Sequence, residues 1–296
     1  ASDGLTDVIP AIGAMALGAQ RLLPNLQLIY IGVTNLRGQE QTVIDVIEFS
    51  NQPVNEANHR DLNHLTFDHS LDFENVDFQF NSHSPMVLKG LSFSITKGDR
   101  VGFMGPTGSG KSTTIDLLMG LLTPSSGRIS VDNIPLVGKA RLEWQKNIAH
   151  VPQDLYLLDA SFTENIAFCV PSHEIDLERV KKAAKSAHIH DFIVNSQDGY
   201  QGLVGERGIQ LSGGQRQRVG IARALYKDSF VLVFDEATSA LDTDTETAVM
   251  SSIEKINRDI TIIMIAHRVS TLKHCDHIYR LENGTIVENI EAASIQ

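Results

Sequence analysis

The chain has 296 residues, of which 42% are hydrophobic and 21% charged, as is ordinary for a folded protein with one large domain or two smaller ones. Its formal net charge of −11 argues against nucleic-acid binding, which needs clustered Lys and Arg. Cys169 and Cys275 lie far apart and match no metal-binding spacing, so we predict two buried, reduced thiols in a reducing compartment. The chain begins with Ala and shows no signal peptide, and we expect it to be a piece of a longer protein.

The N-terminal stretch is almost free of charge, because Arg21 is the only charged residue between Asp7 and Arg37. Apolar residues recur there at helical spacing, which predicts one helix from about residue 21 to residue 49. They are Leu22, Leu26, Ile29, Val33, Leu36, Val43 and Ile47. Two interpretations stay open: a long surface or coiled-coil helix, or the end of a membrane-spanning helix that continues into the cytoplasm. Residues 51–65 are polar and indicate a linker.

Strand-like and helix-like patterns alternate from Leu71 onward. Two strand-like runs of apolar residues predict strands on either side of residue 84, and Lys97-Gly98-Asp99 looks like a turn between strands. The apolar residues are Phe73, Val76, Phe78 and Phe80 in the first run, and Leu88, Leu91, Phe93 and Ile95 in the second.

The most specific motif lies at residues 105–112, which match the phosphate loop G-x-x-x-x-G-K-[ST]. An apolar strand at 101–104 precedes it and a helix predicted over 112–122 follows, which is the context that the motif needs. Its glycines let backbone N–H groups turn toward an anion at a helix N-terminus. Lys111 would reach the β- and γ-phosphates of a nucleotide, and the Ser112 hydroxyl would bind Mg²⁺. The predicted binding segment is Gly105, Pro106, Thr107, Gly108, Ser109, Gly110, Lys111, Ser112 and Thr113.

Residues 211–215 read Leu-Ser-Gly-Gly-Gln and precede a helix-like run. Ser212 suits a helix N-cap, and Gly213 and Gly214 leave backbone N–H groups open to a second anion. One nucleotide does not need two phosphate cradles in one domain. We therefore predict a composite site, in which the second cradle of one subunit closes on the nucleotide of another.

An apolar strand is predicted at residues 230–234 and ends in Asp235 and Glu236. Fully apolar strands are typical of parallel sheets, whose carboxyl edge carries ligand chemistry. We predict that Asp235 supports Mg²⁺ and that Glu236 polarises a water against the γ-phosphate. The alternative is an acidic pair that caps a helix.

Residues 105–112, 211–215 and 230–236 together resemble an ABC nucleotide-binding domain, with 211–215 as the ABC-transporter signature. The resemblance implies an α/β fold with a P-loop (RecA-like) parallel-sheet core, an antiparallel β subdomain and an α-helical signature subdomain at about 154–215, preceded by a long N-terminal helix. It divides the chain into the C-terminal part of a transmembrane helix with its cytoplasmic extension (1–50), a linker (51–70) and the nucleotide-binding domain (71–296).

The resemblance also implies roles for single residues. Gln153 looks like the Q-loop glutamine, His267 like the switch histidine, and Ser239-Ala240-Leu241-Asp242 like the D-loop at the dimer seam. Phe80 falls where the family places an aromatic ring that stacks on adenine, more often a Tyr. The implied catalytic residues are Lys111, Gln153, Glu236 and His267. The implied nucleotide contacts outside the loop are Phe80, Ser212, Gly213, Gly214, Gln215, Asp235 and Asp242, and the Mg²⁺ site is Ser112, Gln153 and Asp235.

Three segments resemble those of exporters. Residues 153–159, followed by 164–166, look like the segment that meets the transmembrane coupling helices. Gly205-Glu206-Arg207-Gly208 resembles the exporter X-loop, in which Glu206 and Arg207 would contact transmembrane helices. Residues 19–24 are similar to the last spanning helix of some bacterial exporters of lipid-linked sugars and polysaccharides.

The resemblance therefore implies an ATPase that uses ATP and Mg²⁺ to drive outward transport at the cytoplasmic face of the inner or plasma membrane. Its partners would be a second nucleotide-binding domain (in a homo- or heterodimer), its own transmembrane domain and the membrane, without nucleic acid. The cargo would be a lipid or lipid-linked saccharide, with a peptide or drug exporter as the alternative. A soluble ABC ATPase of chromosome maintenance would need coiled-coil insertions where only about a hundred residues separate the phosphate loop from the signature. The separate ATPase of an importer would not begin with an apolar stretch.

Overall fold

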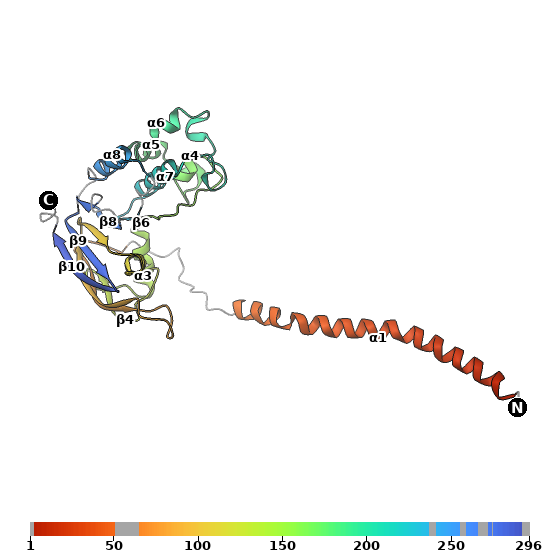
Figure 1. The fold of residues 1–296 in the computed structure, drawn as a ribbon. Helices are drawn as coiled ribbons and strands as arrows, with labels where there is room; N and C mark the ends of the chain where they lie inside the picture. The colour runs from red at the N-terminus through yellow and green to blue at the C-terminus, as the bar shows by residue number, and fades with distance from the viewer. Residues whose placement is uncertain are drawn as a thin grey trace. The chain divides into compact units, whose positions relative to one another are not determined.

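The computed structural model describes residues 3–50, 65–236, 241–254, 259–265, 272–273 and 275–291 (Figure 1). The chain divides into two compact units, Ala1–Ala57 and Asn58–Gln296. The first contains the long helix α1 (Asp3–Ser50), and the second contains the sheets and the remaining helices.

Helix α1 has 48 residues, which corresponds to a length of about 72 Å. The helix predicted over residues 21–49 is confirmed, and it extends toward the N-terminus through Pro10 to Asp3. The apolar residues of the predicted seam are all exposed in this unit: Leu22, Leu26, Ile29, Val33, Leu36, Val43 and Ile47. In the described residues, no helix contains a stretch that is both long and apolar enough to span a membrane.

The larger sheet of the second unit is built around parallel strands. Its order is β10-β9-β3-β8-β7-β6. The strands are β3 (Arg100–Met104), β6 (Ile148–Val151), β7 (Val231–Asp235), β8 (Thr261–Ile265), β9 (His277–Glu282) and β10 (Thr285–Glu291). All neighbouring pairs are parallel except β9 and β10, which form an antiparallel hairpin. The strands predicted at 101–104 and 230–234 are therefore confirmed in the core of this sheet.

The smaller sheet is antiparallel and has the order β2-β1-β4-β5. Its strands are β1 (Ser70–Phe78), β2 (Leu88–Thr96), β4 (Ser126–Val131) and β5 (Ile134–Pro135). Alternate residues of β2 are buried from Leu91 to Ile95, which puts one face of the predicted strand on the core. The first strand ends earlier than predicted: β1 stops at Phe78, and Phe80 lies beyond it with 65% of its surface exposed.

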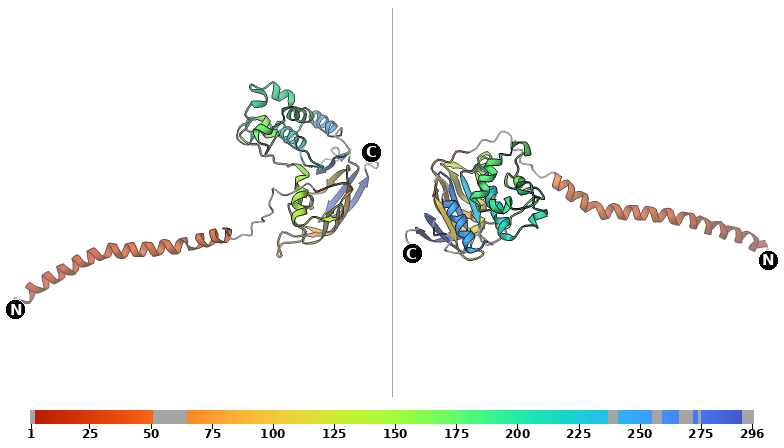
Figure 2. Two further views of the ribbon diagram at one scale, coloured as in Figure 1. Left: turned by 180° about the vertical axis from the view of Figure 1, so that it is seen from behind. Right: turned by 90° about the horizontal axis from the view of Figure 1, so that it is seen from above.

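Helices surround the larger sheet, and α4 (Phe162–Ile166), α5 (Leu177–Ser186), α6 (His190–Val194) and α7 (Gly213–Tyr226) gather at one end of the second unit, with α8 (Thr243–Glu254) beside α5 (Figures 1 and 2). The short turns η2 (Ser172–Glu174), η3 (Gly199–Gln201) and η4 (Glu206–Gly208) lie between α4 and α7 in the chain. The remaining helices are α2 (Lys111–Leu118) and α3 (Gly138–Lys146). Helices α4, α5 and α6 lie within residues 154–215, where the α-helical subdomain is predicted, and α7 extends to Tyr226.

Two further predictions about local structure are wrong. Helix α2 ends at Leu118 and not at Leu122, because Gly120 adopts a left-handed conformation (φ +70°) that stops the helix. Cys275 is buried as predicted, but Cys169 is exposed. The prediction that both cysteines are free thiols is confirmed.

The larger sheet separates two hydrophobic cores. Alternate residues of β8 contribute to opposite sides, with Ile262 and Met264 in the core that contains α4, α5 and α7. Ile263 and Ile265 face the other core, which contains α2, Trp144 and the antiparallel sheet. A sheet that is apolar on both faces explains why β7 and β8 are continuous apolar runs in the sequence.

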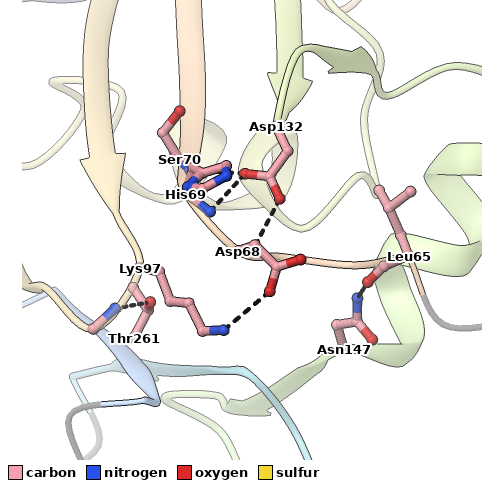
Figure 3. A network of polar contacts seen from close by, with 9 residues as sticks. Leu65, Asp68, His69, Ser70, Lys97, Asp132, Asn147 and Thr261 are labelled. Carbon is pink, nitrogen blue, oxygen red and sulfur yellow. Dashed lines mark hydrogen bonds and ion pairs between the residues drawn. The ribbon is translucent and has the colours of Figure 1, made fainter.

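Residues 65–70 fasten the start of the second unit to its sheets (Figure 3). Leu65 and Phe67 are buried, and the side-chain amide of Asn147 donates a hydrogen bond to the Leu65 carbonyl. The carboxylate of Asp132 accepts hydrogen bonds from the backbone N–H groups of residues 68, 69 and 70 at 2.6 to 2.9 Å. Residues 51–64 of the predicted linker lie outside the described residues.

Candidate nucleotide-binding site

The phosphate loop connects β3 to α2 and has the conformation that only glycine permits at its two ends. Gly105 and Gly110 have φ angles of +149° and +104°. A Cβ atom would lie 2.2 Å from the Leu281 carbonyl oxygen at Gly105, and 2.6 Å from a methyl group of Leu88 at Gly110. The glycines thus allow the loop to turn tightly over β9 and β2, and α2 begins directly after it at Lys111.

Lys111 is almost fully buried, and its ammonium group is held by the loop itself. Its Nζ donates to the carbonyl oxygens of Gly105 at 2.8 Å and Pro106 at 3.0 Å. Burial lowers the pKa of Lys111, while the negative charges of Glu236 and Asp235 act in the opposite direction. A cation kept beneath the loop by neutral carbonyl groups is available to an anionic ligand such as a phosphate.

A cavity of about 350 Å³ lies over the loop. It is lined by Val87, Thr107, Gly108, Gly110, Lys111, Ser112, Thr113, Gln153 and Glu236. The structure therefore brings together the phosphate loop and two of the side chains that the resemblance implicated, Gln153 and Glu236. Sequence reasoning missed Val87, which follows a polar turn and offers no pattern of its own.

Gln153 and Glu236 meet because the strands before them are neighbours. Strands β6 and β7 are parallel, and Val151 is paired with Phe234, so both chains leave the same edge of the sheet. The Gln153 side-chain amide donates to a carboxylate oxygen of Glu236 at 3.0 Å. Glu236 has a left-handed backbone (φ +49°), and its N–H donates to the Ile265 carbonyl at 3.1 Å. This strained conformation at a strand end directs the carboxylate to the cavity instead of continuing β7.

The residues predicted to bind Mg²⁺ offer a suitable donor set. Ser112 and Gln153 line the cavity, and Asp235 is the last residue of β7, one position before Glu236. Hydroxyl, amide and carboxylate oxygens are hard donors, and Mg²⁺ prefers a few such ligands together with water and substrate phosphates. The side chains present thus fit the ion.

The signature residues form a capped helix start elsewhere in the unit and are not among the residues that line the cavity. Ser212 is the N-cap of α7, as predicted: its hydroxyl accepts from the Gln215 N–H at 3.2 Å. The Gln215 side chain in turn accepts from the Ser212 N–H at 2.8 Å. Gly213 and Gly214 follow as the first residues of the helix. The cavity and the signature belong to separate parts of one unit.

Of the other predicted site residues, the structure describes Phe80 and Asp242. Phe80 is exposed, and its ring meets Phe78 edge-on at 5.1 Å, which leaves a face for another ring. Asp242 caps α8, since its carboxylate accepts from the Thr245 N–H at 3.0 Å. His267, Ser239 and Ala240 lie outside the described residues.

A second, larger cavity of about 720 Å³ adjoins the segment after Gln153. Pro152, Asp154, Leu155 and Tyr156 line it together with Arg223, Ala224 and Tyr226 of α7. The predicted X-loop forms η4, in which Glu206 and Arg207 are exposed.

A parallel sheet whose carboxyl edge carries a phosphate loop, a glutamine and an acidic pair defines a P-loop ATPase. The model of the ABC transporter family matches residues 88–239, and the chain belongs to this family as an ABC ATPase domain. This confirms the resemblance drawn from the motifs, and with it the predicted fold class.

Individual relatives agree with this assignment. The leukotoxin translocation ATP-binding protein LktB of Pasteurella haemolytica-like sp. is 44% identical over 217 residues, which are 73% of this chain and 30% of that protein. The ATP-dependent lipid A-core flippase of Chromohalobacter salexigens is 40% identical over 217 residues, which are 73% of this chain and 37% of that protein. The solved structure of a bacterial Atm1-family ABC exporter with ATP bound matches 86% of this chain and 45% of its own, with 37% identity and a TM-score of 0.77. The chain thus spans less than half the length of each of these proteins.

Proposed function

We propose that this chain is the ATPase part of an exporter, in which two nucleotide-binding domains close on ATP and hydrolyse it. The observation that carries the proposal is the cavity that joins the phosphate loop to Gln153 and Glu236. Each of these groups has a role in ATP hydrolysis: Lys111 holds the phosphates, and Glu236 orients a water molecule toward the terminal phosphate. Ser112, Gln153 and Asp235 would hold Mg²⁺, which neutralises phosphate charge when it is bound.

The dimer is part of the proposal, because the signature does not line the cavity of its own chain. The backbone N–H groups at the start of α7, at Gly213 and Gly214, would complete the pocket of a second domain. Asp242 would lie at the same seam, and His267 would contact the terminal phosphate. Phe80 would stack on adenine through its exposed face.

Membrane attachment follows from the segments that resemble exporters. We propose that the cavity beside residues 154–156 receives a transmembrane coupling helix, with Glu206 and Arg207 as further contacts. Helix α1 would be the end of the last spanning helix and its cytoplasmic extension, which places the ATPase on the cytoplasmic face. Its exposed apolar side chains support a place among other helices of the same transporter.

The proposed cargo is a lipid or lipid-linked saccharide. The similarity of residues 19–24 and a relative named as a lipid A-core flippase support this choice. A relative of comparable identity is named for leukotoxin translocation, so a peptide cargo is the alternative. ATPase stimulation of the full-length transporter in lipid, measured with a panel of lipids and peptides, distinguishes the two.

The central test is the substitution Glu236→Gln. Removing the carboxylate should lower ATP turnover about hundredfold or more, because a positioned general base contributes that much to the rate. ATP binding, measured by calorimetry, should persist, and ATP should shift the variant from monomer to dimer in sedimentation. Lys111→Ala is the control and should lose binding itself. Turnover at the wild-type rate in Glu236→Gln would remove Glu236 from its proposed role.

A further inference from the structure

The turn between β9 and β10 lies directly against the phosphate loop, although about 175 residues separate them in sequence. Gly284, at the tip of this turn, donates its N–H to the carbonyl oxygen of Ser109 at 3.1 Å. Its own carbonyl accepts from the Lys89 N–H at 2.9 Å, at the start of β2. One residue therefore joins the phosphate loop to both sheets.

The bond to Ser109 has a consequence for the neighbouring peptide group. A trans peptide unit is planar, and its C=O and N–H point in opposite directions. The carbonyl of Ser109 shares a peptide plane with the N–H of Gly110. When Gly284 holds the carbonyl, the Gly110 N–H is directed away from the hairpin, and Gly110 lines the cavity.

The side chain of Ser109 does not fix this peptide plane. Ser109 is 2% exposed, and its hydroxyl is buried without a hydrogen-bond partner in the part of the chain that the structure describes. At the other end of the loop, the carbonyl oxygen of Leu281 lies only 2.2 Å from the position that a Cβ atom of Gly105 would take. The β9–β10 hairpin thus lies against the phosphate loop at both ends, at Gly105 and at Ser109.

Only glycine can occupy position 284 in this arrangement. Its φ angle is +83°, and it follows Asn283 at φ +51°, the pattern of a tight hairpin turn. A Cβ at this position would lie 2.1 Å from the Val87 carbonyl oxygen and 3.2 Å from the Leu88 Cα. Both atoms are backbone, so the turn would have to move away from β2 and from Ser109.

We propose that Gly284 is a positioning residue of the nucleotide site: it orients the Ser109–Gly110 peptide so that the Gly110 N–H points to a bound phosphate. The proposal rests on the proposed nucleotide binding and adds a residue outside every sequence motif to the site. The hydrogen bonds of Gly284 to Ser109 and Lys89 also explain how the phosphate loop and β2 keep their relative position.

The test compares Gly284→Ala with Gly90→Ala in the full chain. Gly90 also has a left-handed φ of +57°, but no atom lies within 4 Å of a Cβ there, so it carries the conformational cost without the collision. Calorimetry with ADP should show affinity lower by about tenfold or more in Gly284→Ala, as expected when a hydrogen bond to a charged group is lost. Adenosine, which lacks phosphates, should bind both variants equally. Equal ADP affinity in the two variants would overturn the proposal.

If Gly284→Ala does not fold, hydrogen exchange on the wild-type chain tests the proposed role of Gly284 instead. ADP should slow exchange in residues 281–285 together with residues 105–113, and leave helix α5 of the helical subdomain unchanged. Protection of 105–113 without 281–285 would contradict the coupling. Failure of the proposed function is a separate outcome, because the wild-type chain would then bind no ADP.

Discussion

Among single residues, Asp132 holds the backbone that leads into the first strand of the second unit. Its carboxylate accepts three backbone hydrogen bonds from residues 68–70, immediately before β1 (Figure 3). Burial raises the pKa of Asp132, but the N–H donors of Asp68, Ser70 and His69 outweigh it and hold the pKa below its usual value. The ionised form is therefore favoured by folding.

We expect Asp132→Ala to lower the free energy of unfolding by about 1–3 kcal/mol at neutral pH, because three backbone N–H groups lose a charged acceptor. The folded-state pKa is depressed, so this contribution is present above the unfolded pKa and is lost as the pH falls through the folded one. The difference from wild type should thus shrink below about pH 4. Urea denaturation at pH 7 and pH 3 measures it, with exposed Asp198→Ala as the control. A constant difference at both pH values would contradict the assignment.

At the scale of elements, Arg223 joins the signature helix to the segment that follows Gln153. Its guanidinium donates to the carbonyl oxygens of Asn165 at 2.9 Å and Tyr156 at 3.0 Å, and it lies over the Phe168 ring at 4.5 Å. Burial lowers the pKa of Arg223 to about 10, which leaves it charged at neutral pH. Helices α7 and α4 are thereby tied to the wall of the larger cavity.

Arg223→Lys should destabilise the chain although it keeps the charge. A lysine cannot reproduce the planar set of donors, so two carbonyl groups lose their partner, at a cost of about 1–3 kcal/mol. Arg128→Lys is the matched control, because Arg128 pairs with Glu74 at the surface and should cost less than about 1 kcal/mol. Thermal unfolding of the two variants compares them. Equal melting temperatures would show that the Arg223 contacts do not stabilise the subdomain.

The elements themselves were largely predictable, because their signals are local. Apolar runs identified β3 and β7, and the motif at 105–112 located the turn from strand to helix. The errors also have local causes. Gly120 stops α2 through its backbone conformation, and β1 ends before Phe80, whose apolar side chain suggested a longer strand. An exposed aromatic residue cannot be distinguished from a core residue by pattern alone.

The contacts of the site were predictable only as far as the family resemblance reached. Gln153 and Glu236 are 83 positions apart, and their hydrogen bond depends on β6 and β7 being neighbours. Strand order is not encoded in any short window of the sequence. For the same reason, no motif pointed to Gly284 or to Val87: the Asn-Gly pair predicts a hairpin turn, but not what the turn touches.

At the scale of the whole molecule, the phosphate loop and the signature occupy different subdomains of one chain. The loop belongs to the sheet core, and the signature starts α7 in the helical subdomain (Figure 1). In the proposed dimer, a site that uses both would draw them from two copies, each of which supplies one half. This arrangement makes two defective variants complementary.

Lys111→Ala damages the loop, and Ser212→Arg blocks the signature with a bulky cation, so each variant alone should lack turnover. In a mixed dimer, the intact loop of the second variant faces the intact signature of the first. Random mixing makes half of the dimers mixed, with one good site of two, so about a quarter of wild-type ATPase activity should return. The Ser212→Arg chain should retain ATP binding as a monomer, since Ser212 does not line the cavity. Mixtures that stay inactive, although both variants fold and dimerise, would show that the signature does not act across the interface.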